Sequence, residues 1–342
     1  MNFRPQQWTS QVFGILFSTL IVSCGAQNLE FYLYPQALSA GIAEVQSQEP
    51  LGGLEVVGYL PDWKINSLDP AQVRHLTDLV YFSVAVQADG KLATKGLTPS
   101  HLNFLQKVKR EYGIRVILGI TDFKSNGSLA QVASSPSLRV KFAKNLADYL
   151  QQLGFDGADI DWEYPSSTQM PDYENLLCEV KIAFSKQGYR LSVALSPSHP
   201  LTPIGYEMVD RVHGMMYDDE GKHATLEKII VQVEAMIRHG VEPSKLQLGL
   251  PFYGRGYTAH GPKWSQALSY KDLQERFSPE PQQDTASGYY FNGLDTIRQK
   301  VRYAKAAGLS GIMVWEIGQD TTDSSSLLNA ITEVRQGLTR LN

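Results

Sequence analysis

The chain has 342 residues, of which 43% are hydrophobic, 19% charged and 10% aromatic. This composition is typical of a globular protein with a sizeable core, and it excludes a disordered chain, a collagen-like repeat and a coiled coil. The net charge of −4 gives no electrostatic basis for binding nucleic acid, and two cysteines cannot form a disulfide framework. Seven scattered histidines form no HExxH motif or Cys/His cluster, so we expect neither a metal nor another cofactor.

Residues 1–23 are predicted to be a signal peptide and not part of the fold. The apolar run at residues 12–22 is too short to span a bilayer but suits the hydrophobic region of a signal peptide. It ends in Ile21-Val22-Ser23-Cys24, which resembles a bacterial lipobox, so Cys24 is a candidate for lipidation. Ordinary cleavage after Ala26, which would leave no anchor, is the alternative.

Export follows from either processing route. We expect attachment to a bacterial outer membrane or cell surface through a lipid anchor only, and otherwise a secreted protein. Residues 24–53 show no sustained periodicity and are predicted to be a tether. Lipidation of Cys24 would leave Cys178 as a lone thiol, which its apolar helical surroundings predict to be buried.

From residue 54 the chain alternates short apolar runs with longer amphipathic segments. Several of the runs are apolar almost throughout, as is typical of strands buried on both faces. We therefore predict strands at residues 55–60, 79–86, 115–120, 157–162, 190–195, 211–216, 245–251 and 311–315.

Apolar residues at helical spacing predict helices between these strands. Ser135-Pro136 favours a helix start, and an apolar stripe over residues 138–153 follows it, ended by Gly154. Three further stripes are predicted to be helices that end near a glycine: residues 173–184 before Gly188, 226–237 before Gly240 and 294–304 before Gly308.

This alternation of strands and helices predicts right-handed parallel crossovers. Eight repeats across residues 55–317 match the roughly 250 residues of a closed (β/α)8 TIM barrel. An open, doubly wound sheet is the alternative. The first strand leads into Gly58-Tyr59-Leu60-Pro61 and not into a glycine-rich phosphate loop, so a dinucleotide fold lacks its signature. We expect a single barrel domain over residues 54–342.

The candidate chemistry lies in Asp156-Gly157-Ala158-Asp159-Ile160-Asp161-Trp162-Glu163. Side chains alternate along a strand, so the last three acids are predicted to face the barrel axis while Ile160 and Trp162 face the helices. Carboxylates about 7 Å apart with little water cannot all ionise, so the row retains a proton. A protonated carboxyl at the carboxyl end of a barrel strand is what a general acid requires.

A solvated acidic turn or a calcium loop is the alternative for these acids. A calcium loop needs glycine and carbonyl ligands in a frame of about twelve residues with a closing acid. Ile160 and Trp162, interleaved with the acids, fit neither alternative.

The acidic segment resembles the signature of glycoside hydrolase family 18, the chitinases. The resemblance extends from residue 54 to about residue 320 and implies a TIM barrel that hydrolyses chitin or another N-acetylglucosamine-containing oligosaccharide. We expect a monomer, because nothing in the sequence suggests an obligate oligomer. Four other segments agree in order and spacing: Gly58-Tyr59-Leu60-Pro61-Asp62-Trp63, Met215-Met216-Tyr217-Asp218, Gly249-Leu250-Pro251-Phe252-Tyr253-Gly254-Arg255-Gly256 and Gly311-Ile312-Met313-Val314-Trp315-Glu316.

The resemblance also implies catalytic roles. Glu163 would protonate the glycosidic oxygen and later act as base for water, while the acetamido oxygen of the substrate attacks the anomeric carbon. Asp161 would hold the acetamido N–H and stabilise the oxazolinium intermediate, and Asp159 would share a proton with Asp161. Tyr217 would donate its hydroxyl to the acetamido oxygen.

The same resemblance implies a group of substrate contacts. Tyr253 and Arg255 follow the seventh strand, and they contact sugar, support the acids or simply pack at the strand end. Met215 is alternatively a core residue, and His213 is expected to be a satisfied core group and not a catalyst. The candidate substrate-binding residues are Tyr59, Asp218, Trp315, Met215, Tyr253, Arg255 and Tyr164, and the candidate stacking platforms are Tyr164, Trp63, Tyr257 and Trp264.

Two features depart from the most elaborate members of the family. The third strand runs into Leu118-Gly119-Ile120-Thr121-Asp122, where the family usually has Ser-x-Gly-Gly that supports the acids. The segment between Tyr257 and Gly308 is too short for a large inserted α+β subdomain. A shallow, open groove and endo-acting cleavage are therefore expected.

Two other functions stay open. An endo-β-N-acetylglucosaminidase acting on glycoprotein or cell-wall glycans would use the same acids and differ in its loops. A non-hydrolytic chitin-binding lectin would use the same barrel, but such relatives typically lose the terminal acid, and Glu163 is present.

Overall fold

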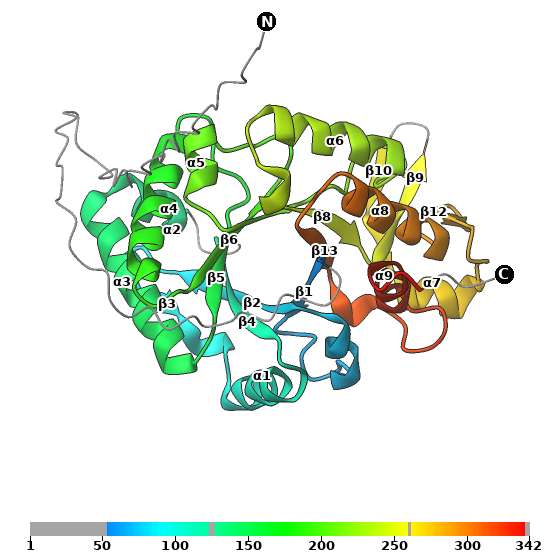
Figure 1. Ribbon diagram of the computed structural model, residues 1–342, viewed down its shortest axis with the longest axis horizontal. Coiled ribbons are helices and arrows are strands. Elements are labelled where there is room, and N and C mark those ends of the chain that lie inside the picture. Colours follow the sequence, from blue (N-terminus) through cyan, green and yellow to red (C-terminus); the bar gives the residue numbers. More distant parts are fainter. Residues whose placement is uncertain (1–52, 123–126, 259–260, 339–342) are drawn as a thin grey trace, which may run out of the picture. The chain divides into compact units, whose positions relative to one another are not determined.

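The computed structural model describes residues 53–122, 127–258 and 261–338 (Figure 1). The predicted signal peptide, Cys24 and nearly all of the tether lie outside this part of the chain. Within it, no helix is long and apolar enough to cross a membrane. Cys178 is buried, as expected.

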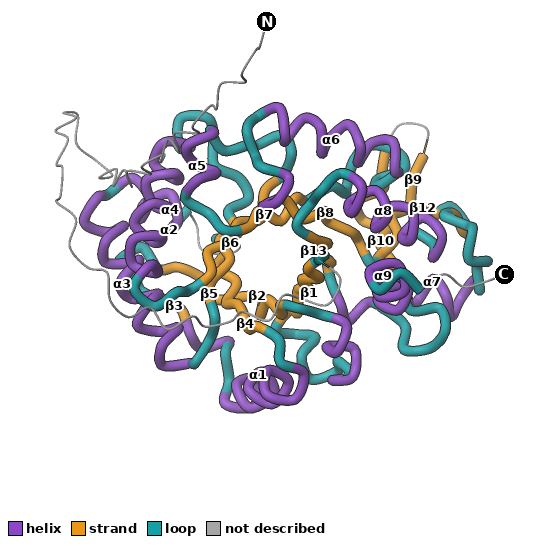
Figure 2. Tube along the Cα trace, in the orientation of Figure 1, coloured by secondary structure: helices purple, strands orange, loops and turns teal. Residues whose placement is uncertain are grey.

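The described strands close into a parallel barrel, with helices around it (Figure 2). The pairing runs β1-β2-β4-β5-β6-β7-β8-β13, and β13 pairs in parallel with β1 again, which excludes the open-sheet alternative. The short strand β3 (Leu92–Ala93) adds an antiparallel hairpin to β2. The barrel strands are β1 (Glu55–Pro61), β2 (Asp78–Val86), β4 (Arg115–Thr121), β5 (Gly157–Asp161), β6 (Arg190–Leu195), β7 (Arg211–Gly214), β8 (Leu246–Pro251) and β13 (Gly311–Trp315).

The helices that cover the barrel are bounded by the caps that the sequence provides. Pro136 begins α3, and Gly154 ends it with a left-handed φ of 65°, a conformation that glycine adopts without strain. Ser135 occupies the N-cap position of α3 but makes no capping hydrogen bond. The helices are α1 (Pro99–Tyr112), α2 (Ser128–Ser134), α3 (Pro136–Leu153), α4 (Met170–Ser185), α5 (Pro203–Glu207), α6 (Leu226–Arg238), α7 (Tyr270–Phe277), α8 (Leu294–Ala306) and α9 (Leu327–Arg335).

A small insertion follows β8. Its strands pair in the order β10-β9-β12-β11 as an antiparallel sheet, with α7 between β10 and β11 in the chain (Figure 1). The expected absence of a large inserted subdomain is confirmed, although the sequence patterns did not predict this small sheet. Its strands are β9 (Tyr253–Thr258), β10 (Gly261–Ser269), β11 (Thr285–Ala286) and β12 (Tyr289–Tyr290).

The apolar side chains of the barrel strands form two layers, one inside the barrel and one between the strands and the helices. The outer layer packs the strands against the helices and contains Ile160 and Trp162. The inner layer comes from alternate positions of the strands, as the pleat requires, and contains Tyr59 and Phe82. The inner layer is Val57, Tyr59, Val80, Phe82, Ile117 and Met313, with Met215, Tyr217 and Trp315 packed against it.

Charged residues close the amino end of the barrel. Glu55, at the start of β1, accepts hydrogen bonds from Arg115, Arg190 and Arg211, which begin β4, β6 and β7. Burial acts to raise the pKa of Glu55, but the hydrogen bonds and charges of Arg211 and Arg190 outweigh it and lower this pKa to about 2. This end is therefore filled by ion pairs, which leaves the carboxyl end of the strands as the accessible mouth.

Candidate active site

The acidic row lies on β5 and just beyond it. Asp159 is fully buried and contacts Tyr59 of the inner layer, whereas Ile160 and Trp162 belong to the outer layer. Trp162 packs edge-on against Tyr173 of α4, with ring centroids 5.3 Å apart. The predicted alternation of the acids and the apolar residues is therefore present. β5 ends at Asp161, so Glu163 lies in the loop at the barrel mouth.

Asp159 is surrounded by hydrogen-bond donors. The Tyr59 hydroxyl donates to Oδ2 at 2.7 Å, and Ser192 on β6 donates to Oδ1 at 2.6 Å. Nδ1 of His213 on β7 lies 3.1 Å from Oδ1 and 2.7 Å from the Tyr59 oxygen. Burial acts to raise the pKa of Asp159, but His213, Ser192 and Tyr59 outweigh it and hold the pKa below its ordinary value. Asp159 is therefore the ionised member of the row.

Asp161 is the opposite case. It is 3% exposed, and its Oδ1 finds no hydrogen-bond partner among the described residues. Burial, followed by the charges of Glu163 and Asp159, raises the pKa of Asp161 well above its ordinary value. Asp161 therefore keeps a proton to higher pH than Asp159, because two neighbouring carboxylates in a poorly hydrated site do not ionise together. The Oδ1 atom of Asp161 is thus an acceptor that no described residue uses.

Glu163 is the accessible member of the row. Its side chain is exposed to solvent on one side, while partial burial and then the charge of Asp218 raise its pKa. The neighbouring Tyr164 hydroxyl acts in the opposite direction. A carboxyl with a raised pKa at the mouth of a barrel retains its proton in the range where a general acid is useful.

The loop after β7 carries the next two site residues. Tyr217 is placed among Tyr253, Asp161, Glu163 and Asp218, and burial, followed by these neighbours, raises its pKa well above 10, so its hydroxyl stays a donor. Asp218 adopts a left-handed φ of 65°. Arg255 on β9 forms a bidentate ion pair with Asp218, in which Nε donates to Oδ1 and Nη2 donates to Oδ2, each at 2.8 Å.

This ion pair fixes the charge of Asp218. Burial acts to raise the pKa of Asp218, but the Arg255 guanidinium and His223 lower it to about 2. His223 is completely buried and accepts from the Asp218 backbone N–H at 3.4 Å. His223 was not among the predicted site residues, and neither was Ser192.

Aromatic rings form the wall opposite the acids. Trp315, at the end of β13, packs edge-on against Phe82 with centroids 4.9 Å apart and lies 5.7 Å from the Tyr59 ring. Met215 packs on the same inner layer. This surface is apolar and half-buried, so it can support the hydrophobic face of a sugar ring.

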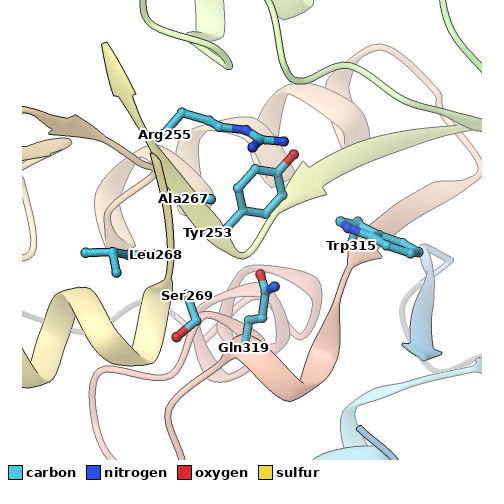
Figure 3. A pocket seen from close by; sticks show the side chains of 7 residues that line it. All are labelled: Tyr253, Arg255, Ala267, Leu268, Ser269, Trp315 and Gln319. Carbon is cyan, nitrogen blue, oxygen red and sulfur yellow. The ribbon is translucent and has the colours of Figure 1, made fainter. Parts of the chain in front are cut away.

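A cavity of about 190 Å³ opens beside this wall, between the inserted sheet and β13. Figure 3 shows the Tyr253 hydroxyl beside the Arg255 guanidinium, with Trp315 across the cavity. The Arg255 guanidinium lies 5.1 Å from the centre of the Tyr253 ring, and the Tyr253 ring meets that of Tyr217 edge-on at 6.3 Å. Tyr253 and Arg255 therefore line the cavity and also contact Tyr217 and Asp218 next to the acid row. The cavity is lined by Tyr253, Arg255, Ala267, Leu268, Ser269, Trp315 and Gln319.

The structure brings most of the predicted site residues together. Tyr59 is 2% exposed, so its polar contacts are with the acid row and His213. Tyr164 is 45% exposed and stacks on His199 with ring centroids 4.5 Å apart, and Trp63 is 63% exposed. Both are available at the surface as stacking platforms. The side chain of Trp264 lies outside the described residues.

The structure also shows how Asp159 is supported although the third predicted strand lacks the Ser-x-Gly-Gly segment. Gly119 of β4 pairs in register with Asp159 on one side, and Ser192 of β6 pairs with it on the other. β4 thus offers no side chain beside Asp159, and the supporting hydroxyl comes from β6 instead. Asp122 turns away to accept a hydrogen bond from the backbone of Leu129 in α2. Among the described residues, no group of three or more His, Cys, Asp or Glu is placed to hold a metal ion.

A closed (β/α)8 barrel with an acidic row at the carboxyl end of one strand is the architecture of a barrel glycoside hydrolase. The family model of glycosyl hydrolases family 18 matches residues 55–320, and the chain belongs to this family. Endochitinase 1 of Metarhizium robertsii is 26% identical over 284 residues, which are 66% of this chain and 66% of that protein. The match therefore spans slightly less than two thirds of that relative.

Solved structures share the fold. The GH18 chitinase ChiB of Flavobacterium johnsoniae superposes with a TM-score of 0.75 at 22% identity, over 84% of this chain and 95% of that one. A plant class V chitinase mutant from Cycas revoluta, solved in complex with (GlcNAc)3, superposes with a TM-score of 0.72 at 21% identity. That match covers 82% of this chain and 99% of the other.

Proposed function

We propose that this protein is a chitinase that cleaves β-1,4-linked N-acetylglucosamine polymers internally, with retention of anomeric configuration. Family membership, the chitinase names of its relatives and the (GlcNAc)3 complex of the Cycas revoluta structure support the substrate class. The observation that carries the mechanism is the contrast within the acid row. Asp159 is held by three donors, while Asp161 is buried with a raised pKa and an unpaired oxygen.

The reaction then proceeds through the substrate's own acetamido group. Glu163 gives its proton to the glycosidic oxygen as the C1–O bond breaks, and the acetamido oxygen bonds to C1 to form an oxazolinium ion. Asp161 gives its proton to Asp159 below it, accepts a hydrogen bond from the acetamido N–H, and stabilises the cation with its negative charge. Glu163, now ionised, takes a proton from water as the water oxygen opens the ring at C1.

The remaining site residues orient the reacting sugar. Tyr217 donates to the acetamido oxygen, which favours the attacking geometry because a positioned internal nucleophile gains from proximity. Asp218, held by its ion pair with Arg255, contacts the same sugar, and Trp315 packs under the sugar ring. The inserted segment after β8 is small, and this favours an open groove and endo-acting cleavage.

The direct test is hydrolysis of N-acetylchitohexaose by the wild-type protein and by Glu163→Gln, with products resolved by chromatography. We expect the wild type to release trimers and dimers from internal bonds, and the variant to lose about 10²- to 10⁴-fold in kcat. Release of dimers from chain ends alone would contradict endo action. Equal inertness with retained binding would indicate a lectin, and cleavage of N-glycans in preference to the hexamer would indicate an endo-β-N-acetylglucosaminidase.

We also propose, from the sequence, that the protein is exported and anchored through a lipid on Cys24. The chain has two cysteines, so a lipid on Cys24 and an intrachain disulfide on Cys178 exclude each other. Intact mass spectrometry of the protein expressed in a Gram-negative host decides between them. A mature chain that starts at Cys24 and carries a diacylglyceryl group supports the proposal. A soluble chain whose cysteines resist alkylation without reductant overturns it.

A further inference from the structure

Three buried donors converge on one backbone carbonyl outside the acid row. The Ala224 oxygen lies 2.5 Å from Nζ of Lys300, 3.0 Å from Nδ2 of Asn292 and 3.3 Å from the Tyr290 hydroxyl. Lys300 lies on α8, Tyr290 on β12 and Asn292 between them, and none of the three is more than 2% exposed. A carbonyl oxygen has two lone pairs, so three donors at hydrogen-bond distance saturate the Ala224 oxygen as an acceptor.

Ala224 belongs to the loop at residues 215–225, which carries the candidate site residues Met215, Tyr217 and Asp218. His223, the preceding residue, approaches Asp218 with Nδ1 3.5 Å from Oδ1, and its ring stacks on Tyr253 with centroids 5.4 Å apart. The Tyr290 ring meets the His223 ring edge-on at 5.7 Å. The donors on the Ala224 carbonyl are thus one residue away from the groups that hold Asp218.

The chemistry of Lys300 is that of a directional donor. Its two hydrogen-bond acceptors are neutral carbonyl oxygens, Ala224 O and Asn292 Oδ1, each at 2.5 Å. Burial lowers the pKa of Lys300 to about 7, although Asp284, Glu227 and Asp219 act in the opposite direction. Even the neutral amine keeps two N–H groups, which suffice for both acceptors. A methionine would fill the same space without desolvating an amine, so the amine's distinct contribution is to fix the carbonyl.

We infer that Lys300, with Asn292 and Tyr290, is a positioning group that fixes the backbone of the 215–225 loop and thereby orients Asp218 toward the sugar. This inference rests on the proposed function, because its effect is on the rate of that reaction. It also assigns a role to the inserted sheet and α8, because the side chains that they contribute hold the backbone of the 215–225 loop in place.

The experiment measures kcat and KM on N-acetylchitohexaose for Lys300→Met, Asp218→Asn and the double variant. We expect Lys300→Met to lower kcat roughly 10- to 100-fold, the range for a displacement of about 1 Å at a reacting group, with a smaller change in KM. In the Asp218→Asn background the same substitution should change kcat by less than about threefold, because residues that act through one another are not additive. Tyr290→Phe, which removes a single hydroxyl and preserves the packing, should lower kcat in the same direction and is the variant to use if Lys300→Met does not fold.

Lys245→Met is the matched control. Lys245 also donates to a backbone carbonyl, that of Tyr206 at 2.9 Å, but at the amino end of the barrel. We expect its kcat to stay within about twofold of the wild type. The inference is overturned if Lys300→Met and Tyr290→Phe keep wild-type kcat, or if the losses of Lys300→Met and Asp218→Asn simply multiply. A wild type that cleaves no oligomer would overturn the proposed function instead, so the two failures are distinguishable.

Discussion

The hydroxyl of Tyr59 lies 2.7 Å from Oδ2 of Asp159, although 100 residues separate them in the chain. This contact crosses the inside of the barrel from β1 to β5. With Ser192 and His213, it keeps one carboxylate of the row ionised and leaves the proton of the row to Asp161. The protonation pattern of the acid row is therefore set by buried residues inside the barrel.

Removing this hydroxyl tests that arrangement. Tyr59→Phe deprives the buried Asp159 carboxylate of one donor, and a hydrogen bond to a charged group contributes about 1.5–3 kcal/mol, so we expect kcat to fall roughly 10- to 100-fold. Tyr81→Phe is the control, because the Tyr81 hydroxyl bonds to Gly96 O and His101 in the outer layer. Steady-state kinetics on N-acetylchitohexaose should separate the two variants. Similar kcat values for both would mean that the Tyr59–Asp159 contact does not support catalysis.

The carboxylate of Asp218 is expected to shift the pH dependence of the reaction. Its negative charge contributes to the raised pKa of Glu163, so Asp218→Asn makes Glu163 easier to ionise. The acid form of Glu163 is then lost at lower pH, and the alkaline limb of kcat/KM should move toward acid. A pH profile of the residual activity measures this shift. An unchanged limb, or one displaced toward alkali, would show that Asp218 does not act on the charge of Glu163.

The charged cluster at the amino end is expected to support stability and not catalysis. Glu55→Gln removes the shared partner of Arg115, Arg190 and Arg211, and we expect the free energy of unfolding at pH 7 to fall by about 2–4 kcal/mol, allowing for the partial exposure of the arginines. Denaturant unfolding followed by tryptophan fluorescence gives the value. Glu234→Gln, in an exposed pair with Arg238, should change it by less than about 0.5 kcal/mol.

The pH dependence of this effect has a definite sign. The pKa of Glu55 is depressed from 4.5 to about 2, so its contribution is complete above pH 4.5 and is lost as the pH falls toward 2. The difference between wild type and Glu55→Gln should shrink across that window. A difference that persisted unchanged at pH 2 would be inconsistent with an ionised Glu55 in the folded state.

Much of this architecture could be predicted because it follows from local pattern. The strands at residues 190–195 and 311–315 have the predicted limits, since apolar runs in a parallel sheet are buried on both faces. β5 is one residue shorter than predicted, because the chain leaves the sheet at Asp161. The inserted sheet was not predicted, because β11 and β12 have only two residues each and β9 has glycine at two alternate positions, so none of the three shows an apolar period.

The supports of the acid row were harder to predict because they depend on register between distant strands. Ser192 and His213 are polar residues inside apolar runs, a signal that they face something polar within the barrel. That signal alone does not identify the partner of either residue, and the sequence predicts only that His213 is a satisfied core residue. The Lys300 contact with Ala224 joins positions 76 residues apart and has no local pattern at all.

The proposed reaction depends on a nucleophile supplied by the substrate, at a site where Glu163 and Asp161 have raised pKa values. The most direct measurement compares hydrolysis of 4-methylumbelliferyl chitobioside and 4-methylumbelliferyl cellobioside, which differ in the acetamido group at C2. We expect release of the fluorophore from the chitobioside and none above background from the cellobioside. Cleavage of both at similar rates would contradict the claim, because the cellobioside has no acetamido oxygen to attack C1.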